Sequence, residues 1–196
     1  MGEANGAGKY WLTIPGEVSQ ANALRRSLIS DLTMLAPSHV RINVNTSCYS
    51  DEYLAKRLGL VPFSQTHKES SDIPCAYLRV QGRSAYSDDI CTEDGPLPHC
   101  GRLLIMHMEQ DQEIDLCIFF TVDAASTHAR FMRTAAVGMR PTSMGTRVQF
   151  DALFGDEDAV RCIAEAIQHI RKRLDAAERI VVGTENQPAI PSRSKG

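Results

Sequence analysis

The hydrophobic pattern of the first third of the chain predicts a helix followed by a strand. From Ser19, a candidate N-cap, apolar side chains recur every three to four residues, at Ala21, Leu24, Leu28, Leu32 and Leu35. This spacing places them on one face of a helix, which we expect Pro37 to end. Val40, Ile42 and Val44 then alternate with polar residues, as in a strand with one buried face.

A second, shorter helix is predicted directly after this strand. Ser50 is a candidate N-cap, and Asp51 and Glu52 suit the positive N-terminal end of a helix dipole. Gly59 favours a helix C-terminus, and Pro62 follows it. Because almost no residues separate the helix, the strand and the short helix, we expect them to act as one docking unit.

The middle of the chain has a different pattern, typical of short strands separated by turns. Short strand-like segments lie at 77–80, 103–107 and 114–122. Glycine, proline and aspartate separate them, most densely at 87–101, which we expect to be an exposed loop. This part of the chain therefore predicts a β-rich insertion.

The ends of the chain supply two further strands and a long amphipathic helix. Strands are predicted at 9–14, before a Pro-Gly turn, and at 147–150. The helix at 156–174 has acidic residues at its start, basic residues at its end and one apolar stripe, formed by Val160, Ile163, Ala164, Ile167, Ile170 and Leu174. The overall prediction is an α+β fold. Residues 184–196 are rich in proline and serine, which predicts a disordered tail.

Composition limits the classes of function. The chain has 196 residues, 43% hydrophobic and 23% charged, with a formal net charge of -3, which fits a globular protein without a broad cationic face. We therefore expect no direct specific binding of nucleic acid. No apolar run is long enough to cross a bilayer, and the first residues lack the regions of a signal peptide, so an intracellular protein without membrane contact is expected. The six cysteines form no CxxC pair, which favours reduced thiols.

Three kinds of active or metal site have little support in the sequence. A zinc site from Cys75, Cys91, Cys100 and a histidine lacks the paired spacing of structural zinc sites. A thiol hydrolase would need one histidine of His99, His107 and His128 as its base, and no motif supports it. Phosphate-binding glycine loops are absent from the sequence, and the acidic clusters at 88–89 and 156–158 suit a turn and a helix start. We expect no catalytic residue, no metal and no cofactor.

Several motifs resemble one family of proteins over nearly the whole chain. The opening segment contains NALRRSL at 22–28, VRINVNTS at 40–47 and DEYLAKRLGLVP at 51–62, and the middle contains AYSDDI at 85–90, QEIDLCIFF at 112–120 and THARF at 127–131. In this order and spacing they are similar to the RNA polymerase assembly subunits. That family comprises bacterial alpha N-terminal domains, their archaeal counterparts and the third-largest subunit of eukaryotic RNA polymerase II.

The resemblance implies a two-part fold. Residues 8–64 and 146–182 would form a dimerisation subdomain, with two helices on a small sheet. An inserted β-rich subdomain would occupy residues 65–145, and residues 183–196 would be the tail. The long helix falls where the family has its second dimerisation helix.

The resemblance also implies a non-catalytic role in a multisubunit DNA-directed RNA polymerase. The chain would dimerise with a smaller homologous subunit, and the pair would be a platform for the two large catalytic subunits. The implied dimerisation residues are Leu24, Leu28, Leu32, Val160, Ile163, Ile167, Ile170 and Leu174. The implied contacts with a large subunit are Arg25, Arg26, Asn45, Asp51, Glu52 and Arg57.

Two alternatives to this role remain, a stand-alone α+β dimerising adaptor outside a polymerase and a thiol-dependent enzyme. The short length fits a viral member of the family. The location would then be the host cytoplasm or the virion, and otherwise the nucleus.

Overall fold

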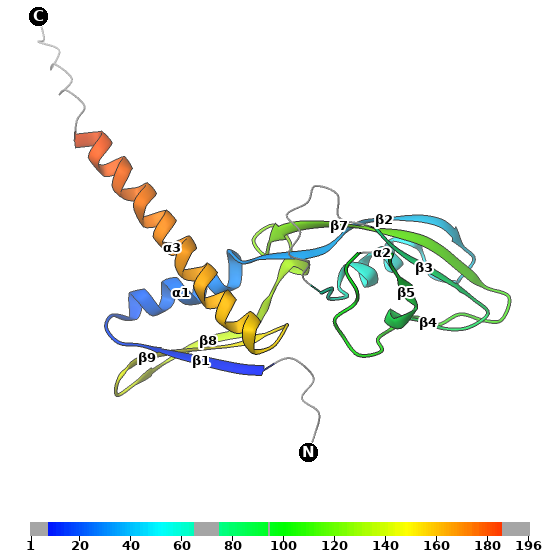
Figure 1. Cartoon of the computed structure of the whole chain (residues 1–196), viewed down its shortest axis with the longest axis horizontal. Coiled ribbons are helices and arrows are strands. Elements are labelled where there is room, and N and C mark those ends of the chain that lie inside the picture. Colours follow the sequence, from blue (N-terminus) through cyan, green and yellow to red (C-terminus); the bar gives the residue numbers. More distant parts are fainter. Residues whose placement is uncertain (1–7, 65–74, 94, 186–196) are drawn as a thin grey trace, which may run out of the picture.

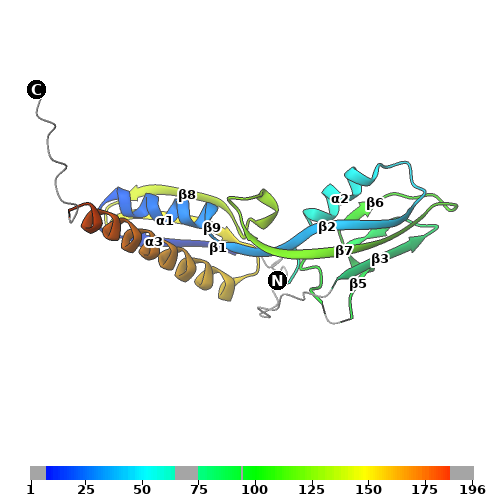
Figure 2. The same ribbon diagram turned by 90° about the horizontal axis from the view of Figure 1, so that it is seen from above.

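The elements of the chain form two lobes that lie end to end (Figure 1). The computed structural model describes residues 8–64, 75–93 and 95–185. We call the lobe built from β1, α1, β8, β9 and α3 the helical lobe, and the lobe built from β2, α2 and β3 to β7 the sheet lobe. Seen from above, β2 and β7 run along the sheet lobe and reach the helical lobe (Figure 2). The α+β class predicted from the sequence is confirmed.

The helical lobe consists of two helices on one face of a three-stranded antiparallel sheet with strand order β1-β9-β8. Its elements are β1 Gly8–Ile14, α1 Val18–Ser30, β8 Thr134–Thr142, β9 Gly145–Ala152 and α3 Asp156–Glu185. Strand β1 pairs with β9 so that Tyr10 lies opposite Phe150. Alternate residues of the strands point toward the helices, and the core between them includes Leu12, Leu24, Leu28, Val148, Phe150 and Cys162.

The sheet lobe is built on an antiparallel sheet with strand order β2-β7-β3-β5, and α2 packs against β2. Its elements are β2 Thr33–Asn45, α2 Asp51–Gly59, β3 Ala76–Gln81, β4 Ala85–Tyr86, β5 Ile90–Cys91, β6 Leu104–Met106 and β7 Glu113–Ala124, with 3-10 helices η1 Ser87–Asp89 and η2 Ala129–Phe131. Strands β4 and β6 form a separate two-stranded sheet. The core includes Leu54, Leu58, Phe63, Leu78, Leu116 and Ile118.

The predicted boundary between the first helix and the following strand is wrong. Helix α1 ends at Ser30, so Leu35 and Pro37 belong to strand β2. Pro37 is tolerated there because β2 is an edge strand, where a missing N–H leaves no ladder bond unmade. Glu17, and not Ser19, is the N-cap residue of α1. For α2, the Ser50 hydroxyl accepts a hydrogen bond from the Tyr53 N–H at 3.4 Å, which confirms the predicted cap.

The chain divides between the lobes differently from the predicted ranges 8–64, 65–145 and 146–182. Strand β2 pairs with β7 along nearly its whole length, so residues 33–64 belong with the insertion. Strand β8, which the sequence did not predict, pairs with β9 and belongs to the helical lobe. Its sequence contains glycine and proline, and a bulge at Ala136, with φ of 50°, interrupts its alternation.

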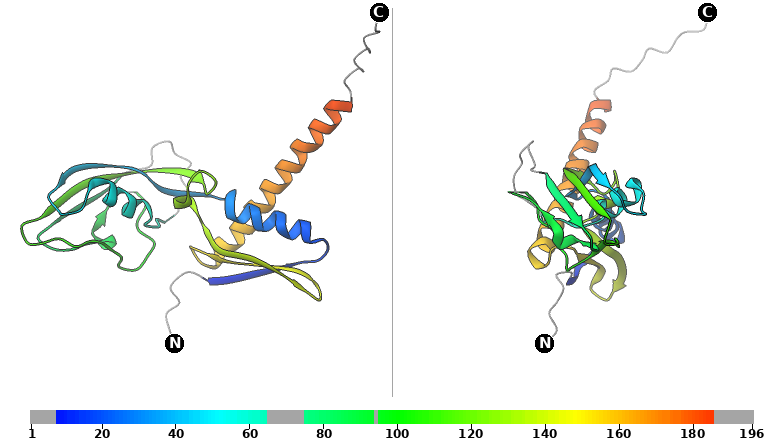
Figure 3. Two further views of the ribbon diagram at one scale, coloured as in Figure 1. Left: turned by 180° about the vertical axis from the view of Figure 1, so that it is seen from behind. Right: turned by 90° about the vertical axis from the view of Figure 1, so that its right-hand side faces the viewer.

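The long helix α3 extends past its predicted end at Leu174 to Glu185. Its C-terminal half leaves the body of the helical lobe, as the orange and red segment in Figures 1 and 3 shows. The start of the predicted tail, up to Glu185, is therefore helical. The rest of that tail, 186–196, lies outside the described residues.

Candidate functional site

The apolar stripe predicted for α3 is divided between the interior and the surface. Ala159, Cys162 and Ala166 are fully or almost fully buried and pack against the helical-lobe core, with Ile163 and Ile170 partly buried beside them. The exposed fraction is 68% for Val160, 37% for Ile167 and 63% for Leu174. Small residues on the buried face allow α3 to lie close to α1, which turns the larger apolar residues outward.

The exposed and partly buried large apolar residues of α3 together have the spacing of a helix that packs against another helix. Positions 160, 163, 167, 170 and 174 alternate steps of three and four residues, the pattern of a coiled-coil seam. From position 171 to 178 every side chain is exposed. We call Val160, Ile163, Ile167, Ile170 and Leu174 the α3 seam.

Three leucines that were predicted as dimerisation residues, two on α1 and one just after its end, do not lie at the surface. Leu24, Leu28 and Leu32 are 3%, 1% and 1% exposed and belong to the core between α1, α3 and the sheet. Their prediction as partner contacts is corrected to a structural role. The physical reason is that α1 lies over β8 and β9, which cover the apolar face of the helix.

A buried ion-pair group fixes the start of α3 on the sheet. The Arg133 guanidinium donates to Asp158 at 2.6 Å and to both carboxylate oxygens of Glu165 at 2.9 and 3.1 Å. The Arg133 and Asp158 side chains are only 8% and 7% exposed. A guanidinium fork on planar acceptors sets orientation well, so this group defines the angle at which α3 leaves the sheet.

A second ion pair ties the middle of α3 to the end of α1. Arg173 donates to the Asp31 carboxylate at 2.7 Å, and Ser30 donates to the same oxygen. Burial acts to raise the pKa of Asp31, but the hydrogen bond from Ser30 and the nearby Arg173 charge outweigh it and keep the pKa below its usual value. The α3 seam is therefore held on a rigid support up to this point.

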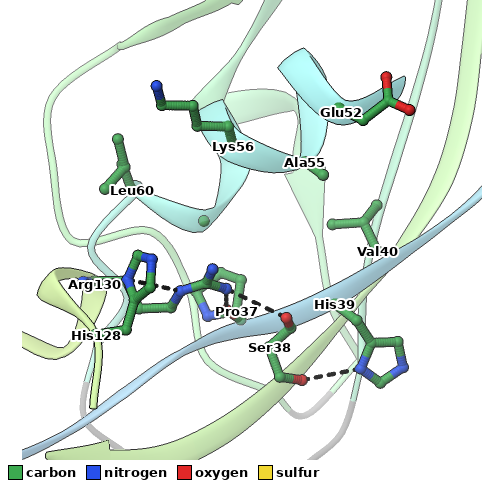
Figure 4. A pocket seen from close by; sticks show the side chains of 11 residues that line it. Pro37, Ser38, His39, Val40, Glu52, Ala55, Lys56, Leu60, His128 and Arg130 are labelled. Atoms are coloured by element: carbon green, nitrogen blue, oxygen red, sulfur yellow. Dashed lines mark hydrogen bonds between the residues drawn. The ribbon is translucent and has the colours of Figure 1, made fainter. Parts of the chain in front are cut away.

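A groove lies in the sheet lobe between α2, β2 and η2 (Figure 4). Its volume is about 420 Å³, and its walls include Val40 on β2, and Glu52, Lys56 and Leu60 on or just after α2. Leu60 is 59% exposed although it is apolar. Figure 4 shows the Glu52 and Lys56 side chains along α2, above the strand that carries Val40. The groove thus offers an apolar floor between charged groups of both signs.

The THARF motif closes one end of this groove. The Arg130 guanidinium donates to the backbone carbonyls of Pro37 and Ser38 at 2.7 and 3.2 Å, and His128 Nδ1 accepts from the Arg130 backbone N–H at 3.1 Å. His128 is thereby the N-cap of η2. The motif holds the chain at the point where β2 and η2 meet, which is a structural role.

The residues predicted to contact a large subunit fall into two groups. Asp51, Glu52 and Arg57 lie on α2, and Asn45 lies beside it at the end of β2. The Asn45 amide donates to Asp51 at 2.8 Å and to the Tyr49 carbonyl at 3.0 Å. Arg57 donates to the Leu104 carbonyl. Arg25 and Arg26 lie on α1 in the other lobe, where the Arg25 guanidinium contacts Asn22 at 2.9 Å and Arg26 is exposed.

The groove also contains residues that were not predicted. Lys56 and Leu60 lie inside the DEYLAKRLGLVP motif. Leu60 could have been predicted as a surface contact, because it is an apolar residue directly after the glycine that ends the helix. Arg130 was quoted within its motif without a role in the groove. Only the fold brings Arg130 to the strand that carries Pro37, because 93 residues separate the two.

The structure gives each candidate catalytic histidine a contact that is not a thiol. The His99 ring packs against Phe154 with a centroid distance of 4.8 Å, and His107 Nδ1 lies 3.1 Å from the Ser84 hydroxyl. His128 caps η2. Within the described residues, no three or more His, Cys, Asp or Glu side chains gather as metal ligands, so Cys75, Cys91 and Cys100 do not form such a group there.

Comparison with known proteins supports the predicted relationship. Over 123 residues the chain is 33% identical to the DNA-directed RNA polymerase subunit Rpo3 of Natronomonas pharaonis, a match that covers 61% of this chain and 50% of that protein. It is 24% identical to Rpo3 of Methanocaldococcus jannaschii over 169 residues, which cover 86% of this chain and 87% of the relative. It is 28% identical to RNA polymerase II subunit RPB3 of Schizosaccharomyces pombe over 149 residues, which cover 60% of this chain and 50% of that protein.

These relatives establish the kind of protein to which the chain is similar. The resemblance to the RNA polymerase assembly subunits is confirmed, and the chain is related to that family through Rpo3 and RPB3. The matches span about half the length of the Natronomonas and fission yeast proteins. No protein-family model matches the chain. Among the helices that the structure describes, none combines the length and apolar character needed to cross a bilayer.

Proposed function

We propose that this chain is a non-catalytic assembly subunit of a multisubunit DNA-directed RNA polymerase. It pairs with a smaller homologous subunit, and the pair is the platform on which the two large catalytic subunits assemble. The α3 seam is the observation that carries this proposal, since it leaves large apolar residues at the surface of a chain whose relatives are polymerase subunits. The chain would share the location of its polymerase, in the nucleus or, for a viral member, in the host cytoplasm or virion.

The energetics of the α3 seam favour a protein partner. Fully burying a valine, leucine or isoleucine side chain contributes roughly 1.5–3 kcal/mol of transfer free energy. Val160, Ile167 and Leu174 are 68%, 37% and 63% exposed. A partner that covers them would therefore gain part of this transfer free energy. Their spacing suits a partner helix that lies along α3.

The surroundings of α2 supply the second contact, with a large subunit. The groove places Leu60 and Val40 between the charges of Glu52 and Lys56. Such a mixture of apolar floor and polar rim is typical of transient and permanent protein interfaces. We therefore assign Asn45, Asp51, Glu52 and Arg57 to this contact, with Lys56, Leu60 and Arg130 added from the structure.

The experiment compares two variants of the tagged full-length chain, expressed in its native host. Leu174→Asp places a carboxylate on the α3 seam, and Ala176→Asp places the same group on an exposed position of the same helix away from the seam. We expect native mass measurement of the captured wild-type complex to show one smaller subunit and two very large chains. We expect the Leu174→Asp variant to lose them and the Ala176→Asp variant to retain them.

Three results would overturn the proposal. Equal capture of the polymerase by both variants would exclude the α3 seam as the dimerisation surface. Capture of a small homologue without any large chain would favour the alternative role of a dimerising adaptor outside a polymerase. A catalytic turnover of the chain alone that is lost on cysteine alkylation would favour the thiol enzyme.

A further inference from the structure

The outer face of the sheet lobe, opposite α2, carries a row of unusual side chains. Residues that alternate with the core point outward, and the strand register aligns four of them across β2, β7, β3 and β5. They are Arg41, Cys117, Tyr77 and Cys91. The neighbouring strands are seen side by side in Figure 2. Because Cys75 precedes Tyr77 by two residues, it belongs to the same face.

Two of these thiols, Cys75 and Cys117, lie beside the same tyrosine. Cys75 Sγ lies 3.0 Å from the Tyr77 hydroxyl oxygen, and Cys117 is the register partner of Tyr77. Because Ala76 pairs with Ile118, Cys117 lies diagonally across from Cys75 on the neighbouring strand, and each thiol influences the pKa of the other. Cys75 is partly exposed and Cys117 is buried. The pair therefore combines a thiol that a small solute can reach with a sheltered thiol at its side.

The surroundings make the two thiols chemically unequal. The Tyr77 hydroxyl lowers the pKa of Cys75, since it can donate a hydrogen bond to the thiolate. Burial raises the pKa of Cys117 to about 11, and the contact with Cys75 adds to this. The Arg41 charge favours the ionised form of both. Arg41 is the register partner of Cys117, and its guanidinium lies over the Phe119 ring, 5.3 Å from its centroid.

We propose that Cys75 and Cys117 form a peroxide-reactive thiol pair, in which Cys75 is the attacking thiol and Cys117 the resolving thiol. Reactive cysteines of this kind are accessible thiolates next to a second cysteine. The arrangement is independent of the proposed assembly role, because the residues lie on the opposite side of the sheet from α2 and in a different lobe from α3.

The reaction consumes one hydroperoxide and gives one disulfide. The Cys75 thiolate attacks one peroxide oxygen, the O–O bond breaks, and the leaving oxygen takes a proton to form water or an alcohol. Cys75 is thereby oxidised to a sulfenic acid and the peroxide is reduced. The Cys117 sulfur then attacks the Cys75 sulfur, the S–O bond breaks, and the hydroxyl group leaves with the Cys117 proton as water.

The test treats the purified full-length chain with hydrogen peroxide and follows all six cysteines by peptide mass mapping. We expect a peptide pair linked through Cys75 and Cys117, with the loss of two hydrogen atoms, before Cys48 or Cys91 is modified. Both of these cysteines are exposed and serve as internal controls, and Cys91 also lies on the same face. In the Cys117→Ser variant, we expect the sulfenic acid at Cys75 to accumulate and to be trapped by dimedone.

Further variants separate the roles of the groups. Cys75→Ser should abolish peroxide-dependent change at Cys117, and Tyr77→Phe should slow the oxidation of Cys75 while Cys48→Ser leaves it unchanged. Oxidation of Cys48 or Cys91 as fast as Cys75 would overturn the proposal, and so would a Cys75 sulfenic acid that never proceeds to the disulfide in the wild-type chain. The wild-type mapping needs no substitution, so it decides the question even if Cys117→Ser folds poorly.

Discussion

At the scale of single residues, the charged groups that matter most for stability are those removed from water. Arg133 and Asp158 are both more than nine-tenths buried, whereas the ion pair between Arg79 and Asp115 has one side chain that is 79% exposed. Removal of one partner from a buried pair leaves an uncompensated charge, while exposed pairs contribute little. Two ion pairs of similar length therefore have very different consequences.

We expect Arg133→Ala to lower the free energy of unfolding by about 3–5 kcal/mol, because Asp158 would be left buried without its partner. Arg79→Ala is the control and should change it by about 1 kcal/mol or less. Urea unfolding followed by circular dichroism measures both. A loss of similar size in the two variants would show that the Arg133 group does not hold α3 on the sheet.

Asp89 in the AYSDDI motif gives a dependence of stability on pH. The Arg83 guanidinium donates to both carboxylate oxygens of Asp89, at 2.7 and 2.9 Å, and lowers the pKa of Asp89. A hydrogen bond from the Tyr86 backbone N–H lowers this pKa further. The stabilisation is present above the unfolded pKa of about 3.9 and is lost as the pH falls through the lower folded pKa. Between about pH 5 and about pH 2, wild type should thus lose more stability than Asp89→Asn. Asp88→Asn, at the exposed neighbour, should follow wild type in the same acid titration.

At the scale of elements, the hairpin of β8 and β9 depends on the backbone of one glycine. Gly145 has φ of +134°, and an added Cβ would lie 2.2 Å from the Ile14 carbonyl oxygen at the end of β1. The three strands can meet here only because the side chain is missing. The same sheet supports α1 and α3, so the position of the α3 seam depends on this close approach.

Gly145→Ala should therefore destabilise the helical lobe by at least the strain of an unfavourable φ, about 1–3 kcal/mol. Gly101→Ala is the matched control, since nothing lies within 4 Å of its added Cβ, and it should stay within about 0.5 kcal/mol of wild type. Thermal unfolding of both variants tests this. An unchanged melting temperature in Gly145→Ala would contradict the close packing of β1 against the hairpin.

At the scale of the whole molecule, the two lobes carry two kinds of surface. The helical lobe presents the α3 seam, the sheet lobe presents the groove beside α2, and β2 joins them as one continuous strand. A partner that binds only the folded chain stabilises it by mass action. Pairing and folding should therefore be linked in this protein.

We expect the chain to be more stable with the smaller partner that we propose for it than alone. At a free partner concentration of 100 times the dissociation constant, the apparent free energy of unfolding should rise by about 2.7 kcal/mol. Leu174→Asp should remove this increase, and Ala176→Asp should retain it. Denaturant titration with and without the co-purified partner measures the difference, and an equal midpoint in the two titrations would contradict the linkage.

Much of the local structure was determined by neighbours close in sequence. The cap at Ser50, the short helix it begins and the amphipathic helix from Asp156 were predicted from spacing and end residues alone, and these elements are present. The polymerase-subunit motifs likewise predicted the similarity to the Rpo3 and RPB3 subunits before the fold was known. Periodicity and capping depend on residues a few positions apart, so a single sequence contains this information.

The sequence by itself determined the α+β class, the helices α2 and α3 and the relationship to polymerase subunits. Only the tertiary structure decided that β2 joins the sheet lobe, that Leu24, Leu28 and Leu32 face the chain's own sheet, and that α3 turns Val160 and Leu174 outward. An apolar stripe shows that a face must be covered but not by which surface. That choice depends on strand pairings between residues about 70 or more positions apart, such as Ile42 with Leu116.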